Sequence, residues 1–241
     1  MSILDSVDMS SMLESQFIKD TQSTELEVLT DIYQENTNIV VWKRSLADKL
    51  IQAADILLDK QPDLEKLIVL SPNNAFSSVY KVIGNSEHYK VLAQDIAQLV
   101  DIFCRLFDIK HATLKLTALD RAMCPRFHVD RVPCRMITTY HGAATEWLPH
   151  HLADRSKLGT GNKGKPDEFS GIFERSNNIR QLSVGDVALL KGELWYKNEG
   201  AGLIHRSPQL SSSNRRLLLT IDFIDDSYSN SYGEKNEKTF C

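Results

Sequence analysis

Apolar residues recur at helical spacing in three segments of the first half of the chain. The segments are residues 24–34, 45–59 and 86–108, and in each the apolar positions lie three or four residues apart. This spacing gathers them on one face of a helix, which can then pack on a core. Ser45 stands where an N-cap is expected. The pattern therefore predicts three core-packing helices.

The pattern changes after residue 110. Residues 111–119 and 132–140 alternate between apolar and polar positions, and residues 185–196 and 215–223 are apolar runs that follow turn or loop residues. Helices followed by strands predict an α+β chain, with a helical N-terminal region (residues 1–110) packed on an antiparallel β core (residues 111–225). Short strands with glycine-rich connections are typical of a barrel or sandwich.

Two polar stretches fall outside these elements. Residues 150–178 form a long polar, glycine-rich segment with little periodicity, which predicts a functional loop such as a mobile lid over a pocket. Residues 226–241 have the composition of a disordered tail.

Composition narrows the function classes. The 241 residues are 42% hydrophobic and 25% charged, with a net charge of −4, so the chain shows no basic excess for nucleic-acid binding. No apolar run reaches the roughly 18 residues of a membrane span. The first residues lack the basic cluster of a secretory signal, and the four cysteines are too few for a disulfide framework. We expect a cytoplasmic protein; no pattern indicates its oligomeric state.

The segment CPRFHVDRVPC, residues 124–134, carries candidate metal ligands. In an extended chain, His128 and Asp130 point to the same side and can serve as adjacent ligands. Cys124 and Cys134 share their parity, and a thiolate, imidazole and carboxylate set suits Zn(II). A proline next to each cysteine argues against one regular strand, which favours the cysteines as bystanders.

A third histidine lies far downstream. His205 follows a Gly-Asp turn with its strand, and Arg215 comes ten residues after it. This order resembles the Fe(II)/2-oxoglutarate-dependent dioxygenases, whose fold is the double-stranded β-helix (jelly-roll or cupin-like). The resemblance covers about residues 111–224 and implies that His128, Asp130 and His205 bind iron. It also implies that Arg215 binds the C5 carboxylate of 2-oxoglutarate. Arg216 is the alternative, because neighbouring strand residues face opposite ways.

A longer segment resembles a second family. Residues 124–149, CPRFHVDRVPCRMITTYHGAATEWLP, are similar to the central signature of an uncharacterised bacterial family, catalogued as a domain of unknown function. Members of that family often occur beside zinc-responsive genes, which implies a link to zinc homeostasis and no settled activity.

Three functions follow as hypotheses. The first is an Fe(II)/2-oxoglutarate-dependent oxygenase that hydroxylates an unknown small-molecule or protein substrate. The second is a non-catalytic zinc-binding protein of metal homeostasis that uses the same His/Asp pocket with Cys124 or Cys134. The third is a protein-interaction module on a cupin-like scaffold. Arg215 discriminates the first from the second, because an oxygenase needs that cation inside the barrel and a zinc-binding protein does not.

Overall fold

Strands from both halves of the chain form one large sheet. The computed structural model describes residues 18–211 and 214–224. The seven strands of the sheet, in spatial order, are β1 (Lys19–Ser23), β2 (Thr37–Trp42), β8 (Val187–Lys191), β5 (Cys134–His141), β10 (Arg216–Asp222), β4 (Ala112–Leu119) and β3 (Glu65–Leu70). All neighbours are antiparallel except the edge pair β1 and β2.

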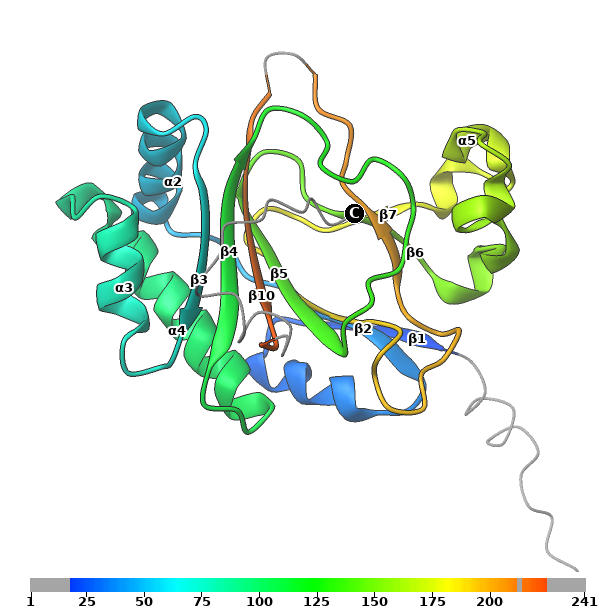
Figure 1. Cartoon of the computed structure of the whole chain (residues 1–241), viewed down its shortest axis with the longest axis horizontal. Helices are drawn as coiled ribbons and strands as arrows, with labels where there is room; N and C mark the ends of the chain where they lie inside the picture. Colours follow the sequence, from blue (N-terminus) through cyan, green and yellow to red (C-terminus); the bar gives the residue numbers. More distant parts are fainter. Residues whose placement is uncertain (1–17, 212–213, 225–241) are drawn as a thin grey trace, which may run out of the picture.

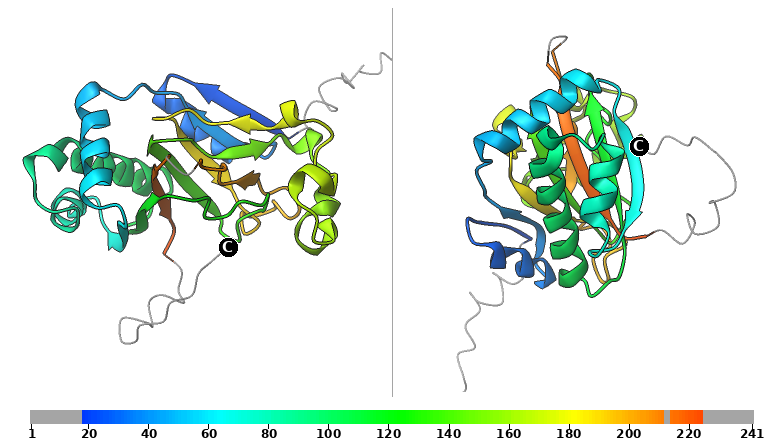
Figure 2. Two further views of the ribbon diagram at one scale, coloured as in Figure 1. Left: turned by 90° about the horizontal axis from the view of Figure 1, so that it is seen from above. Right: turned by 90° about the vertical axis from the view of Figure 1, so that its left-hand side faces the viewer.

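Helices cover one face of this sheet, as Figures 1 and 2 show. They are α2 (Asp48–Lys60), α3 (Ala75–Val82) and α4 (Lys90–Leu106), with the 3-10 turns η1 (Leu26–Tyr33) and η2 (Glu87–Tyr89). In α4, the buried residues Leu92, Ile96, Leu99 and Phe103 recur every three or four positions. They join Leu217 and other strand residues in the largest apolar cluster. Helical periodicity and strand alternation thus meet in one core.

A second, small sheet faces the other side of the large one. Its strands are β7 (Arg180–Gln181), β6 (Glu146–Leu148) and β9 (Ile204–Arg206). An interior apolar cluster joins Trp147 of β6 to Ile39, Ile137, Ala188 and Leu218 of the large sheet. The chain is therefore a mixed α/β protein whose core is built mainly from sheets. Among the described residues, no helix is both long and apolar enough to cross a bilayer.

The N-terminal half contains strands that the sequence pattern did not predict. β1, β2 and β3 all precede residue 110, so residues 1–110 are not a purely helical region. β2 lies between β1 and β8, and five of its six residues are buried. A short run buried on both faces lacks the alternation that marks a half-exposed strand. The predicted segments 45–59 and 86–108 correspond to α2 and to η2 with α4, whereas residues 24–34 form the 3-10 turn η1.

The polar segment 150–178 is built from short helical turns. They are η3 (His150–Leu152), η4 (Arg155–Lys157), η5 (Gly159–Asn162), α5 (Asp167–Ser170) and η6 (Ser176–Asn178). They lie at the end of the molecule opposite α2 and α3 (Figure 1). Ile172 from this segment packs with Phe127, Leu148 and Ile204 in a third apolar cluster. The segment is anchored to the small sheet. The predicted tail, residues 226–241, lies outside the described residues.

Candidate metal centre

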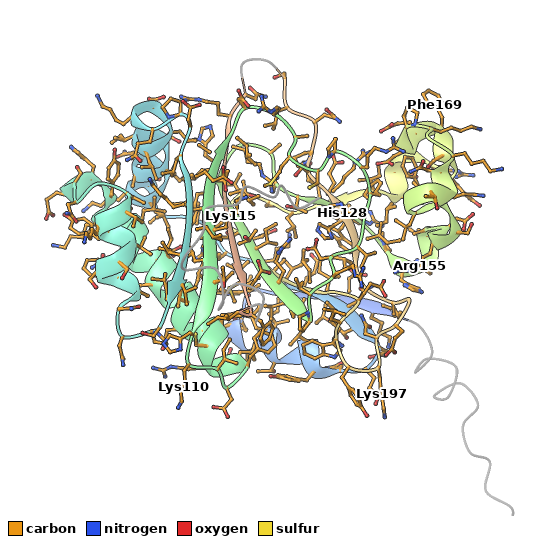
Figure 3. All side chains as sticks on the ribbon, viewed as in Figure 1. Lys110, Lys115, His128, Arg155, Phe169 and Lys197 are labelled. Carbon is orange, nitrogen blue, oxygen red and sulfur yellow. The ribbon has the colours of Figure 1, made fainter. Side chains whose placement is uncertain are left out.

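Three side chains singled out by the sequence lie together between the two sheets. Ligand atoms of His128, Asp130 and His205 all fall within 4.8 Å of one another. Asp130 Oδ1 is 3.6 Å from His128 Nε2, and Asp130 Oδ2 is 3.4 Å from His205 Nε2. Figure 3 places His128 near the middle of the molecule, between the long strands and the α5 segment. Two imidazole nitrogens and a carboxylate oxygen form a donor set that divalent transition metals accept.

Backbone pairing positions both imidazoles. His128 and His205 form an isolated antiparallel bridge, in which each backbone N–H donates to the other's carbonyl oxygen at 3.0 Å. His128 Nδ1 lies 2.9 Å from the Arg126 carbonyl oxygen, and His205 Nδ1 lies 3.2 Å from that of Leu203. A carbonyl only accepts, so Nδ1 carries the proton on each ring. Both Nε2 atoms are then free to bind a metal, which is the usual orientation of ligating histidines.

The charges in this cluster favour an ionised Asp130. Burial alone would raise the pKa of Asp130, but His205, His128 and Arg135 together hold that pKa well below its usual range. For His128, burial acts to lower the pKa, and hydrogen bonds with Asp130 and the Arg126 carbonyl raise it overall. The cluster therefore favours an ionised carboxylate beside an imidazole whose affinity for a proton is increased. Because a metal ligand must be deprotonated, a divalent cation would compete with a proton for Nε2 of His128.

Arg135 links the cluster to the large sheet. Its Nη1 donates to Asp130 Oδ2 at 2.7 Å, and its Nε donates to Asp222 Oδ1 at 2.8 Å. Arg135 on β5 and Asp222 on β10 are directly opposed in register. Burial raises the pKa of Asp222, while its contact with Arg135 acts in the other direction. Asp130 itself lies in the irregular segment between β4 and β5, so its side chain is oriented from the neighbouring sheet.

Asp167 fixes the chain on the outer side of the small sheet. This carboxylate is 4% exposed and lies at the start of α5. Its Oδ2 accepts hydrogen bonds from the Phe127 backbone N–H at 2.8 Å and from Arg206 Nη1 at 3.0 Å. Arg126 Nε donates to Oδ1 at 3.0 Å. Because Phe127 precedes His128 and Arg206 follows His205, one buried carboxylate holds the neighbours of both histidines.

The two arginines at the start of β10 have different surroundings. Arg215 Nη2 donates to Asp59 Oδ1 at 2.5 Å and its Nη1 donates to the Leu58 carbonyl at 2.6 Å, so it points to α2. Arg216 is 1% exposed, and its Nη2 donates to the hydroxyls of Thr139 at 3.1 Å and Thr145 at 2.7 Å. The register of β10 thus turns Arg216, the alternative, to the interior, whereas the preferred Arg215 points to α2.

The side chains of Arg216 and His205 face the same interior space between the two sheets. Trp147 is paired directly with His205 across β6 and β9, so their side chains share one face. Trp147 belongs to the interior cluster. Thr145, two residues before Trp147, points the same way and accepts the Arg216 hydrogen bond. The guanidinium and the histidine therefore face the space between the two sheets.

The two cysteines of the motif lie on different sides of β5. Cys134 is fully buried in the helix-facing core, on the side of the strand opposite Arg135, and burial raises the pKa of its thiol. Cys134 therefore points away from the candidate metal ligands. Cys124 lies close enough to Arg135 to interact with it electrostatically. Among the described residues, the cluster of candidate ligands comprises His128, Asp130 and His205, without either cysteine.

The sequence of the chain matches one family over most of its length. The family is described as "Protein of unknown function (DUF1826)", and its sequence model matches residues 23–222. The chain belongs to the DUF1826 family. This match includes all three members of the cluster and also Arg215 and Arg216. No curated protein matches the chain.

Solved structures similar to this DUF1826 chain include three with related descriptions. A dioxygenase for auxin oxidation in rice is 10% identical over 77% of this chain and 72% of that chain, with a TM-score of 0.44. A Pseudomonas putida prolyl-4-hydroxylase is 10% identical, with coverages of 81% and 96% and a TM-score of 0.42. HygX from Streptomyces hygroscopicus, with nickel and 2-oxoglutarate bound, is 11% identical, with coverages of 83% and 86% and a TM-score of 0.41. These likenesses assign no residue a role.

Several residues of the site in the DUF1826 chain carried no signal in its sequence. Arg135 and Asp222 belong to two strands that are distant along the chain, and they meet only through strand register. Asp167 was part of a segment that looked like an unanchored loop. Thr145 lies in the short link before β6. The alternation of Arg135 with Cys134 and Met136 predicts only that Arg135 lies on the opposite face of the strand from the apolar core.

Proposed function

We propose that the protein is an Fe(II)/2-oxoglutarate-dependent oxygenase in which His128, Asp130 and His205 hold the iron. The donor set supports this proposal, since two histidines and one carboxylate leave three positions of an octahedral Fe(II) open. With iron and 2-oxoglutarate bound, the centre would use dioxygen to hydroxylate a C–H bond while 2-oxoglutarate is converted to succinate and carbon dioxide. The double-stranded β-helix is part of the same proposal, and two sheets enclosing an interior are consistent with it.

The surroundings of Arg216 support the binding of 2-oxoglutarate in addition to a metal. Its guanidinium is buried and donates to two threonine hydroxyls, and its Nε has no hydrogen-bond partner among the described residues. Burial lowers the pKa of Arg216 to about 10. A buried cation without an anion is costly, and a carboxylate offers a guanidinium two parallel hydrogen bonds. The far carboxylate of 2-oxoglutarate fits that requirement.

The chain's own residues have defined tasks in this proposal. Arg216 binds the C5 carboxylate, and Thr139 and Thr145 hold the guanidinium and supply hydroxyls beside it. The apolar residues around them, including Ile137 and Leu218, keep water from the co-substrate. Asp130 and the two Nε2 atoms fix the metal.

The other hypotheses stay as predictions. Zinc binding with a cysteine now depends on Cys124, because Cys134 is on the far side of β5. A cytoplasmic location and a link to zinc-responsive genes stay as predictions beside the oxygenase. Nothing in the described residues favours a role as an interaction module over the oxygenase.

Anaerobic loading with Fe(II) followed by 2-oxoglutarate tests the proposal. We expect a visible metal-to-ligand charge-transfer absorption when 2-oxoglutarate chelates the iron, and succinate on admission of air. H205A should abolish metal binding. R216M should keep Fe(II) binding and weaken 2-oxoglutarate binding by about 100-fold, because one charge-assisted pair is worth about 2–3 kcal/mol.

R215M is the matched control, since it removes a neighbouring arginine that points to α2. It should retain 2-oxoglutarate binding. Iron-loaded protein that neither absorbs with 2-oxoglutarate nor forms succinate would contradict the oxygenase proposal. Tight zinc binding lost in C124S would favour the zinc hypothesis instead.

A further inference from the structure

The three candidate ligands are held in place by different means. The imidazoles of His128 and His205 are fixed by their backbone bridge and by carbonyl oxygens of neighbouring residues. Asp130 lies in the irregular segment before β5, and its backbone carbonyl accepts from the Glu193 N–H at 2.9 Å. Its carboxylate contacts three side chains: His128 Nε2 lies 3.6 Å from Oδ1, and His205 Nε2 lies 3.4 Å from Oδ2. The shortest of the three contacts is the 2.7 Å hydrogen bond that Arg135 donates to Oδ2.

Arg135 is itself fixed at its other end. Its Nε donates to Asp222, its directly opposed neighbour on β10, and both residues sit in regular strands of the large sheet. The side chains of Arg135, Asp130 and Asp222 are 27%, 15% and 18% exposed, so solvent screens the contacts only partly. A planar guanidinium that spans two carboxylates fixes direction as well as distance. The side chain of Arg135 thus connects the regular large sheet to Asp130 in the irregular segment before β5.

We propose that Arg135 is a positioning residue that holds Asp130 for ligation through one oxygen, with Asp222 anchoring Arg135. This inference rests on the proposed metal centre. Both oxygens of Asp130 lie near a candidate ligand: Oδ1 is 3.6 Å from His128 Nε2, and Oδ2 is 3.4 Å from His205 Nε2. Because Arg135 already donates to Oδ2, we assign ligation to Oδ1. Ligation through one oxygen keeps three positions open, whereas ligation through both would leave two. The three open positions are what a bidentate 2-oxo acid and dioxygen together require.

The obvious variant is complicated by Asp222. R135Q alone would leave two partly buried carboxylates without their cation, which destabilises the fold. The double variant R135Q/D222N replaces the cross-strand ion pair by two amides of similar size and retains Asp130. It therefore separates loss of stability from loss of positioning. R131Q is the matched control, because Arg131 is an exposed arginine next to Asp130 in the chain.

The experiment titrates metal-free full-length protein with Co(II) in the absence of 2-oxoglutarate. Calorimetry gives the affinity and the visible d–d bands report the coordination of the ion. For R135Q/D222N we expect about 10- to 100-fold weaker binding, the usual effect of removing a partner of a metal ligand, together with a changed cobalt spectrum. R131Q should match the wild type in both. R135K should recover part of the affinity but not the wild-type spectrum, since one ammonium cannot span both carboxylates.

The outcomes are distinguishable. A folded R135Q/D222N with wild-type affinity and spectrum overturns the positioning role and leaves the oxygenase proposal untouched. Wild-type protein that binds Co(II) but, loaded with iron, fails to bind 2-oxoglutarate overturns the oxygenase proposal and leaves the role of Arg135 intact. If the wild type binds no divalent ion, both are wrong.

Discussion

Lys191 at the end of β8 is a buried ammonium. It is 1% exposed, donates to the Gln34 carbonyl at 2.7 Å and lies 4.9 Å from the centre of the Trp195 ring. Burial lowers its pKa from 10.5 to about 8. Between these values the unfolded chain holds a proton that the folded chain has released. The free energy of unfolding should therefore rise with pH across this window.

K191M tests this linkage. The variant keeps the length of the side chain and cannot titrate, so the wild type should gain stability relative to it by about 2 kcal/mol between pH 7.5 and 10. Urea denaturation at a series of pH values measures the difference, and other titrating groups largely cancel. K110M, at an exposed lysine, is the control for loss of a charge. A difference that stays constant with pH would contradict the prediction.

At the scale of elements, α5 and its flanking turns support the candidate metal ligands from the outer side of the small sheet. Asp167 carries this contact, since it accepts from Arg126, Phe127 and Arg206. We expect D167N to lower the free energy of unfolding by about 3 kcal/mol, because a charge buried among two guanidinium groups is lost. Metal affinity should fall as well, since the neighbours of both histidines lose a partner.

E168Q is the matched control for D167N. Glu168 also contacts Arg206, at 3.1 Å, but its side chain is 55% exposed. Exposed ion pairs contribute little, so E168Q should cost less than about 1 kcal/mol. Chemical denaturation and Co(II) titration of the two variants give the comparison. Equal losses of stability and metal affinity in the two variants would contradict the prediction. They would show that any negative charge near Arg206 has the effect that we assign to the buried carboxylate of Asp167.

The predictability of these elements from sequence varies with how local their cause is. The alternation in β4 and the apolar run in β10 predicted those strands, because each pattern is present in the element itself. β6 and β9 have three residues each and exist through pairing with one another, so neither has a pattern to read. The order of His128, Asp130 and His205 marked the candidate ligands. The choice between Arg215 and Arg216 needed the register of β10.

At the scale of the whole molecule, the N-terminal half completes the sheet of the C-terminal half. β2 pairs with β8, and β3 pairs with β4. The largest apolar cluster joins Leu57 and Phe103 to Leu189 and Leu219. A division at residue 110, as the sequence pattern predicted, would cut through both the sheet and this core. The described part of the chain thus has the contacts of one cooperative unit.

We therefore expect a single unfolding transition for the metal-free protein. Tryptophan fluorescence reports Trp42 on β2, Trp147 in the interior and Trp195 beside the helix-facing core, and far-UV circular dichroism reports the helices. The two probes should give coincident urea curves with one midpoint. A chain beginning at residue 111 should not fold, because it lacks β2, β3 and the helical layer that covers the sheet. Two separated transitions, or a folded fragment with dispersed amide resonances, would show that the halves are independent after all.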